Sequence, residues 1–176
     1  MSHTNSMLVL VLTVGLFLPS GSSVRAAGGL DTIVGAFTTP REAGTSSWVL
    51  SVREGDSAVG FIRWSRTFED GSPTRVRSYD VRYANIHVND EGKQEGWVAA
   101  TLASDTGGPL PVEPVWFVGR YVDGGHPGSA GDYYRYSPEG QDEATARNAA
   151  ENWTAEGLAS WRSTVIDKGN FEIRSF

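Results

Sequence analysis

Short runs of β-branched and aromatic residues alternate with turn residues along most of this chain, and this alternation constrains the fold more than any other feature. The runs Ser47–Arg53 and Ala58–Trp64, for example, flank Glu54–Ser57, where glycine, aspartate and serine favour a tight turn. Strands joined by such turns form antiparallel hairpins. The pattern therefore predicts an all-β sandwich or barrel rather than alternating strands and helices.

Eight segments have this strand-like composition: Ile33–Thr38, Ser47–Arg53, Ala58–Trp64, Val76–Val88, Gly96–Ala103, Val115–Val122, Tyr133–Tyr136 and Phe171–Phe176. Eight antiparallel strands joined mostly by short turns favour an up-and-down barrel, because closure removes the exposed sheet edges. A barrel of this size is just wide enough inside to hold one small ligand.

The segment Gln141–Trp161 departs from the strand pattern and predicts one helix inserted before the last strand. Its start carries the acidic residues Asp142 and Glu143, which suit the positive end of a helix dipole. Gly157 is a weak helix former and offers an earlier end for the helix. Apolar residues recur through the segment at helical spacing, namely Ala146, Ala149, Ala150, Trp153 and Trp161.

The N-terminal segment has the features of an export signal. The apolar run Met7–Leu18 is too short to cross a bilayer, and it is followed by a helix-breaking proline and by small residues up to Ala27. We therefore expect residues 1–27 to be a cleaved secretory signal peptide and residues 28–176 to be an exported, extracellular or periplasmic domain. A buried helix of the core is the alternative for this run.

Composition narrows the function classes. The chain has no cysteine and three histidines, and its 15 Lys and Arg against 21 Asp and Glu give a net charge of −6. We expect no nucleic-acid partner, because phosphate binding needs a clustered basic excess, and no membrane partner. Neither a G-x-S-x-G elbow nor a spaced set of metal ligands is present. The sequence thus predicts a protein that is not an enzyme and that needs neither cofactor nor metal.

Two polar or irregular loops keep other interpretations open. The loop Asp123–Asp132 contains two carboxylates and His126, which suits acid–base work or weak cation binding as well as an ordinary connection. The loop Ser104–Pro114 is rich in glycine and proline and exposes Leu110, so presentation of Leu110 to a protease, as an inhibitor does, is an alternative function.

Several segments, in order, resemble the avidin and streptavidin family. Ala159–Phe171 is similar to the family's segment in which a tryptophan, a basic residue, Ser-Thr and two apolar residues precede the final strand. Phe117–Val122 resembles an aromatic-x-Gly-polar-aromatic strand of the family, and Gly96–Ala99 its Gly-Trp strand. Near the start, Gly35–Phe37 and Gly44-Thr45 stand where the family has Gly-x-Trp and Gly-Ser. The resemblance implies an eight-stranded barrel that binds biotin at one end.

The resemblance also implies a set of ligand-binding residues. Thr45 and Ser65 match hydroxyls on the ureido oxygen, and Trp161 matches a tryptophan that a neighbouring subunit lends, in a homodimer or homotetramer. Arg63 falls where the family has a tyrosine, and Gly169 where it has the ureido-nitrogen acceptor. The remaining residues implied at the site are Thr39, Thr101, Trp116, Phe117, Tyr134, Tyr136 and Asn170. An avidin-like barrel with a different or weakly bound ligand is the alternative.

Overall fold

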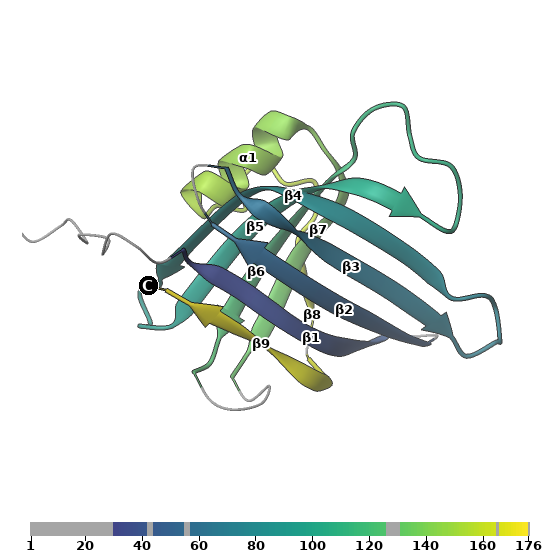
Figure 1. Ribbon diagram of the computed structural model, residues 1–176, viewed down its shortest axis with the longest axis horizontal. Helices are drawn as coiled ribbons and strands as arrows, with labels where there is room; N and C mark the ends of the chain where they lie inside the picture. The colour runs from purple at the N-terminus through teal and green to yellow at the C-terminus, as the bar shows by residue number, and fades with distance from the viewer. Residues whose placement is uncertain (1–29, 42–43, 55–56, 126–130, 165, 176) are drawn as a thin grey trace, which may run out of the picture.

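The computed structural model describes residues 30–41, 44–54, 57–125, 131–164 and 166–175 (Figure 1). The predicted signal peptide, residues 1–27, and His126 lie outside these ranges. In this part of the chain, nine strands form one sheet in the order β8-β7-β6-β5-β4-β3-β2-β1-β9. The strands are β1 (Thr32–Arg41), β2 (Gly44–Arg53), β3 (Val59–Phe68), β4 (Arg75–Val88), β5 (Gln94–Asp105), β6 (Trp116–Asp123), β7 (Tyr133–Gln141), β8 (Arg162–Thr164) and β9 (Lys168–Arg174).

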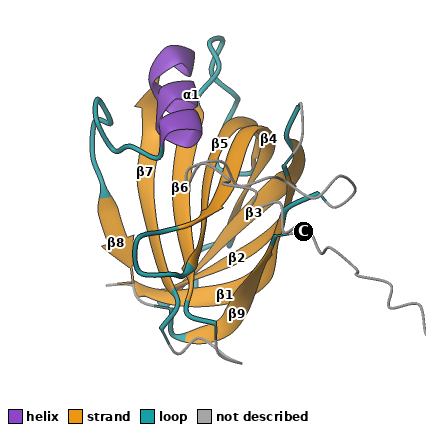
Figure 2. Cartoon of the chain, turned by 90° about the vertical axis from the view of Figure 1, so that its left-hand side faces the viewer, coloured by secondary structure: helices purple, strands orange, loops and turns teal. Residues whose placement is uncertain are grey.

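The sheet is antiparallel throughout and curls into a half-barrel (Figure 2). Its two outermost strands, β8 and β9, are consecutive in the chain: β8 pairs with β7, and β9 pairs with β1. The all-β barrel-like class is therefore confirmed, although the described strands number nine rather than eight. The additional strand is Arg162–Thr164, whose three residues are too few to give a sequence pattern and are held by pairing with Tyr134–Tyr136.

The predicted helix is present but shorter than Gln141–Trp161. Helix α1 spans Glu143–Asn152 and is capped by Asp142, whose carboxylate accepts a hydrogen bond from the Thr145 N–H at 2.7 Å. The helix ends where Trp153 adopts a left-handed conformation with φ of 54°. After that turn the chain has left the helix, so Gly157 and Trp161 lie outside it.

Helix α1 covers the outer side of the sheet over β4, β5 and β6 (Figure 2). Strand side chains alternate between the two faces, so Trp97 and Ala99 of β5 face the helix whereas Val98 and Ala100 face the inner side. The outer cluster packs the alanines of α1 on aromatic and small residues of the sheet: Trp97, Ala99, Trp116, Val118, Ala146, Ala149 and Ala150.

The inner side of the half-barrel is lined largely by aromatic side chains. Gly119 of β6 allows two of them to approach the sheet closely, because a Cβ at this position would lie 2.9 Å from the Tyr121 ring and 3.1 Å from that of Phe117. The inner aromatic residues are Phe37, Trp48, Tyr79, Phe117, Tyr121, Tyr134, Tyr136 and Phe171. The core of the domain and any ligand site on this side therefore share the same walls.

Candidate small-molecule site

One end of the inner side carries a row of polar atoms without partners. Thr39 on β1 lies opposite Ser46 on β2, and Ser46 lies opposite Arg66 on β3. The Thr39 Oγ1, the Ser46 Oγ and the Arg66 Nε are all buried and have no hydrogen-bond partner among the described residues. Buried polar groups are normally paired, and leaving one unpaired costs about 1–3 kcal/mol. Three such atoms on adjacent strands mark this end as a place where a ligand would complete the hydrogen bonding.

A second layer of buried polar atoms lies farther along the same side. It consists of the Trp48 Nε1, which has no hydrogen-bond partner among the described residues, and the hydroxyls of Tyr121 and Tyr134, which lie close enough to affect each other's pKa. Burial raises the pKa values of both tyrosines above the ordinary phenol value, so both stay protonated at neutral pH and can donate as well as accept. The layer thus offers a donor from an indole and two hydroxyls of mixed character.

Aromatic rings surround these polar atoms. The Trp48 ring centroid lies 5.1 Å from that of Tyr134, 5.8 Å from that of Tyr136 and 5.9 Å from that of Phe117. Trp64, opposite Trp48 on β3, widens this wall, with its ring centroid 6.3 Å from that of Trp48. Flat apolar walls with a few aimed polar atoms are the usual composition of a small-molecule site.

Arginines dominate the charge at this end. Asp105 accepts hydrogen bonds from the Arg75 Nε at 3.0 Å and from the Arg77 Nε at 2.8 Å. These contacts, the one from Arg75 first, hold the pKa of Asp105 well below its ordinary value. The Arg77 guanidinium also lies 5.6 Å from the Trp64 ring centroid. The nearby carboxylate of Asp105 is therefore occupied by two cations and does not reach Arg66 by any described contact.

Four of the residues that the sequence implied for the site lie on this inner side: Thr39, Phe117, Tyr134 and Tyr136. Thr45 and Ser65 do not. Because strand residues alternate between faces, the buried Ser46 and Trp48 of β2 leave Thr45 exposed on the outside. On β3 the inward Ile62 and Trp64 likewise place Ser65 on the outer face.

Three further implied residues lie under or beside the helix. Thr101 accepts a hydrogen bond from the Arg82 Nε at 3.3 Å, and Trp116 stacks on Tyr83 with ring centroids 5.8 Å apart. Trp161 stacks on Trp97 of the same chain, with centroids 5.3 Å apart and planes only 7° from parallel. These three belong to the outer face and do not meet the inner row.

Asn170 lies on β9, next to the buried Phe171 in the alternating strand pattern and not in the row. It lines a hollow of about 530 Å³ together with Lys93 and Asp123. Its Oδ1 is buried and has no hydrogen-bond partner in the part of the chain that the structure describes. The direct match to the family's ureido-nitrogen acceptor, Gly169, has no side chain, so this acceptor is absent from the chain.

The predicted set lacks four inner-side residues that carry buried polar atoms: Ser46, Trp48, Arg66 and Tyr121. Their signal is the alternation itself, because placing the tryptophan Trp48 inward also places Ser46 inward. On β3 the same rule, applied from Ile62, selects Arg66. The family resemblance instead implied Thr45 and Ser65, each of which is one position away from an inward polar residue.

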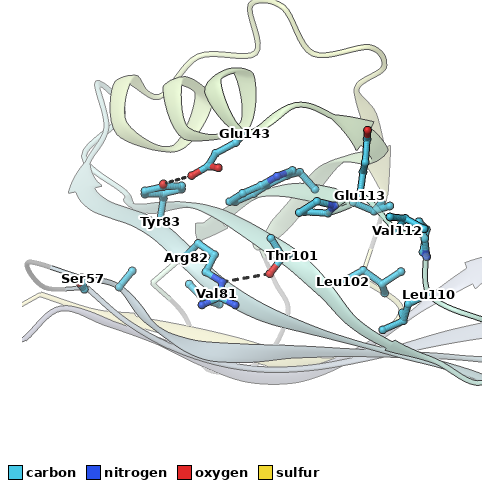
Figure 3. A pocket seen from close by; sticks show the side chains of 15 residues that line it. Ser57, Val81, Arg82, Tyr83, Thr101, Leu102, Leu110, Val112, Glu113 and Glu143 are labelled. Carbon is cyan, nitrogen blue, oxygen red and sulfur yellow. Dashed lines mark hydrogen bonds between the residues drawn. The ribbon is translucent and has the colours of Figure 1, made fainter.

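A separate groove lies on the outer face (Figure 3). It has a volume of about 650 Å³ and runs between the start of α1, strand β4 and the loop before β6. The Tyr83 hydroxyl donates to the Glu143 Oε1 at 2.6 Å at one end of the groove. At the other end the loop exposes Leu110, which is 47% exposed, and Val112, which is fully exposed.

No protein-family model, curated protein or solved structure matches this chain. Among the described residues, no group of three or more His, Asp or Glu side chains is placed to hold a metal ion. In the same part of the chain, no helix has both the length and the apolar character needed to cross a membrane.

Proposed function

We propose that this protein binds a small molecule on the inner side of the half-barrel, at the end that carries Thr39 and Ser46. The observation that carries the proposal is the row of buried polar atoms on Thr39, Ser46 and Arg66, which have no hydrogen-bond partner among the described residues and lie on the same side of the sheet as a cluster of aromatic rings. A ligand with a flat apolar body and several donors and acceptors would satisfy these atoms and bury its own surface against the rings.

Biotin is the first ligand to test. The resemblance of the strand motifs to the avidin and streptavidin family motivates this choice, and the chemistry of the inner side supports it. A ureido group needs donors for its oxygen and acceptors for its two N–H groups, and hydroxyls such as those of Thr39, Ser46 and Tyr134 serve both needs. The loss of an acceptor at Gly169 favours weaker binding than the family pattern implies.

The proposed activity is binding without covalent chemistry. The polar groups of the row are hydroxyls and a guanidinium, which lack the adjacent base that an activated nucleophile requires. The carboxylate of Asp105, at the same end of the sheet, is held by Arg75 and Arg77. We further propose that the domain is exported and self-associates, as the N-terminal segment and the family resemblance imply.

The test is calorimetric titration of residues 28–176 with biotin, together with a thermal melt in the presence and absence of biotin. In the double variant Thr39→Val with Ser46→Ala, we expect binding weakened roughly tenfold or more, because each lost hydroxyl hydrogen bond contributes about 0.5–1.5 kcal/mol. The matched control is Thr45→Val, because Thr45 lies on β2 beside Ser46 but its side chain is exposed.

Stability separates a binding role from a structural one. Since the hydroxyls of Thr39 and Ser46 have no partner in the described chain, their removal should leave the melting temperature unchanged or slightly higher. Absence of saturable heat with biotin in the wild-type domain excludes biotin. Equal weakening by Thr45→Val and by the double variant would contradict the placement of the site.

The loop Ser104–Pro114 supports a second candidate function, protease inhibition. The loop is closed at its base by a hydrogen bond from the Leu102 N–H to the Val115 carbonyl at 2.9 Å, and it exposes Leu110 and Val112. A fastened loop with an exposed apolar residue is what an inhibitor presents. Incubation with a protease that cleaves after leucine tests this candidate: rapid cleavage at Leu110 without loss of protease activity excludes it.

A further inference from the structure

We propose that the ligand of the inner site carries an acidic group and that Arg66 binds that group. The inference rests on the proposed function, because it concerns the same site and names the class of ligand. The sequence motifs do not point to Arg66, and the residue enters only through its place on β3 beside Ser46.

The geometry places Arg66 within the polar row. Neighbouring strands lie about 4.8 Å apart, and the register aligns Thr39, Ser46 and Arg66 side by side across three strands. The inward side of β3 is fixed by Ile62, which is fully buried, and by Trp64, which packs on the core. Arg66 continues this side toward the end of the strand, so it lies beside Ser46 and two strands from Thr39 on the same face of the sheet.

The guanidinium of Arg66 packs on an aromatic ring and has no acidic partner among the described residues. Its Cζ lies 4.8 Å from the centroid of the Phe68 ring, a distance at which a cation is attracted to an aromatic face. Its Nε is buried and unpaired among the described residues. Arg75, opposite Arg66 on β4, is instead paired with Asp105. Arg66 therefore lacks a hydrogen-bond acceptor for its Nε among the described residues, and an anionic oxygen binds a guanidinium more strongly than a neutral oxygen does.

The row also offers the kinds of donor that a carboxylate accepts. A guanidinium binds the two oxygens of a carboxylate with parallel hydrogen bonds, and hydroxyls at the side can donate to the lone pairs that remain. Trp48 and Trp64 then face the body of the ligand. The ligand class is thus a small aromatic or heterocyclic molecule with a carboxylate, and free biotin belongs to the same charge class.

The experiment compares acids with neutral analogues of the same size. The probes are 1-naphthoate against 1-naphthalenemethanol, and biotin against its methyl ester, titrated into residues 28–176 by calorimetry and by tryptophan fluorescence. We expect each acid that binds to bind roughly tenfold to a hundredfold more tightly than its neutral analogue, the range that charge-assisted hydrogen bonds provide. The preference should also decrease as salt is raised.

The variants are Arg66→Gln and the matched control Arg63→Gln, which removes an exposed arginine from the outer face of the same strand. Arg66→Gln should abolish the preference for the acid and leave the neutral analogue unaffected, whereas Arg63→Gln should change neither. Arg66→Lys keeps the charge but not the paired geometry and should retain part of the preference.

The outcomes separate the inference from the proposed function. Binding of biotin and its methyl ester with equal affinity, unchanged in Arg66→Gln, would overturn the role of Arg66 while leaving a small-molecule site. Binding of neither biotin nor naphthoate would overturn both. The acid-to-neutral ratio in the wild-type protein needs no variant, so a folding defect in Arg66→Gln does not remove the test.

Discussion

Glu95 of β5 is a buried carboxylate on the outer face that accepts four hydrogen bonds from side chains. Its replacement by glutamine is expected to destabilise the domain strongly. The residue is only 3% exposed. It accepts hydrogen bonds from the Arg120 Nε at 2.8 Å and Nη2 at 2.7 Å, from the Trp97 Nε1 at 2.6 Å and from the Asn89 Nδ2 at 3.0 Å. Glutamine keeps one acceptor oxygen but loses the charge that Arg120 requires.

The size of the effect follows from these contacts. Removing one partner of a buried ion pair costs about 3–5 kcal/mol, and the 22% exposure of the Arg120 side chain lets water recover part of this cost. We therefore expect a loss of about 2–4 kcal/mol in the free energy of unfolding. For a domain of this length each kcal/mol lowers the melting temperature by about 2–4 °C, so Glu95→Gln should melt roughly 5–15 °C lower.

Thermal unfolding followed by circular dichroism measures this change. The control is Glu91→Gln, because Glu91 is an exposed turn residue whose ion pair with Lys93 at 2.9 Å contributes little. Should Glu95→Gln melt within about 2 °C of the wild type, the reasoning would be refuted, since the four contacts would then have no net energetic effect.

Two further predictions concern stability. Burial raises the pKa of Glu95, but hydrogen bonds from Arg120, Asn89 and Trp97 outweigh this effect, and Arg75 and Arg77 lower the pKa of Asp105. A carboxylate with a lowered folded-state pKa stabilises the fold above its unfolded pKa and loses that contribution as pH falls. The free energy of unfolding should therefore decrease below about pH 4. Denaturant titrations across that range should show a smaller decrease in Glu95→Gln than in the wild type, and parallel curves would contradict the assignment. Gly119→Ala should cost about 1–3 kcal/mol of unfolding free energy, because the new methyl group would lie 2.9 Å from the Tyr121 ring. The control Gly108→Ala places its methyl group in open space and should leave the stability unchanged. Urea denaturation of the two variants measures the difference, and equal midpoints would be inconsistent with the tight packing on β6.

The comparison of Thr45 with Ser46 shows where prediction from the sequence stops for the site. The residues of the hairpin are apparent from the sequence, but which of two adjacent hydroxyls faces inward depends on the register of β1 with β2. A shift of one residue moves every side chain of a strand to the opposite face. By the same dependence, the polar residue of β3 that lies on the inner face is Arg66 rather than Ser65.

Trp161 illustrates a second limit. The motif around it predicts a tryptophan lent to a neighbouring subunit, and that role stays a prediction. In the structure the ring stacks on Trp97 in the cluster that α1 covers. Whether a side chain reaches outward or folds back depends on packing partners that are distant in sequence, here about 60 residues away, and no local pattern encodes them.

The sequence by itself determined the elements that depend on local interactions. Alternating β-branched and aromatic residues, turn residues between them and the acidic start of α1 act within a few positions, so the all-β class and the presence of one helix follow from them. Only the tertiary structure decided the inner face of each strand, the end of the helix at Trp153 and the row formed by Thr39, Ser46 and Arg66. These depend on how strands from distant parts of the chain align, which is set by the packing of the whole sheet.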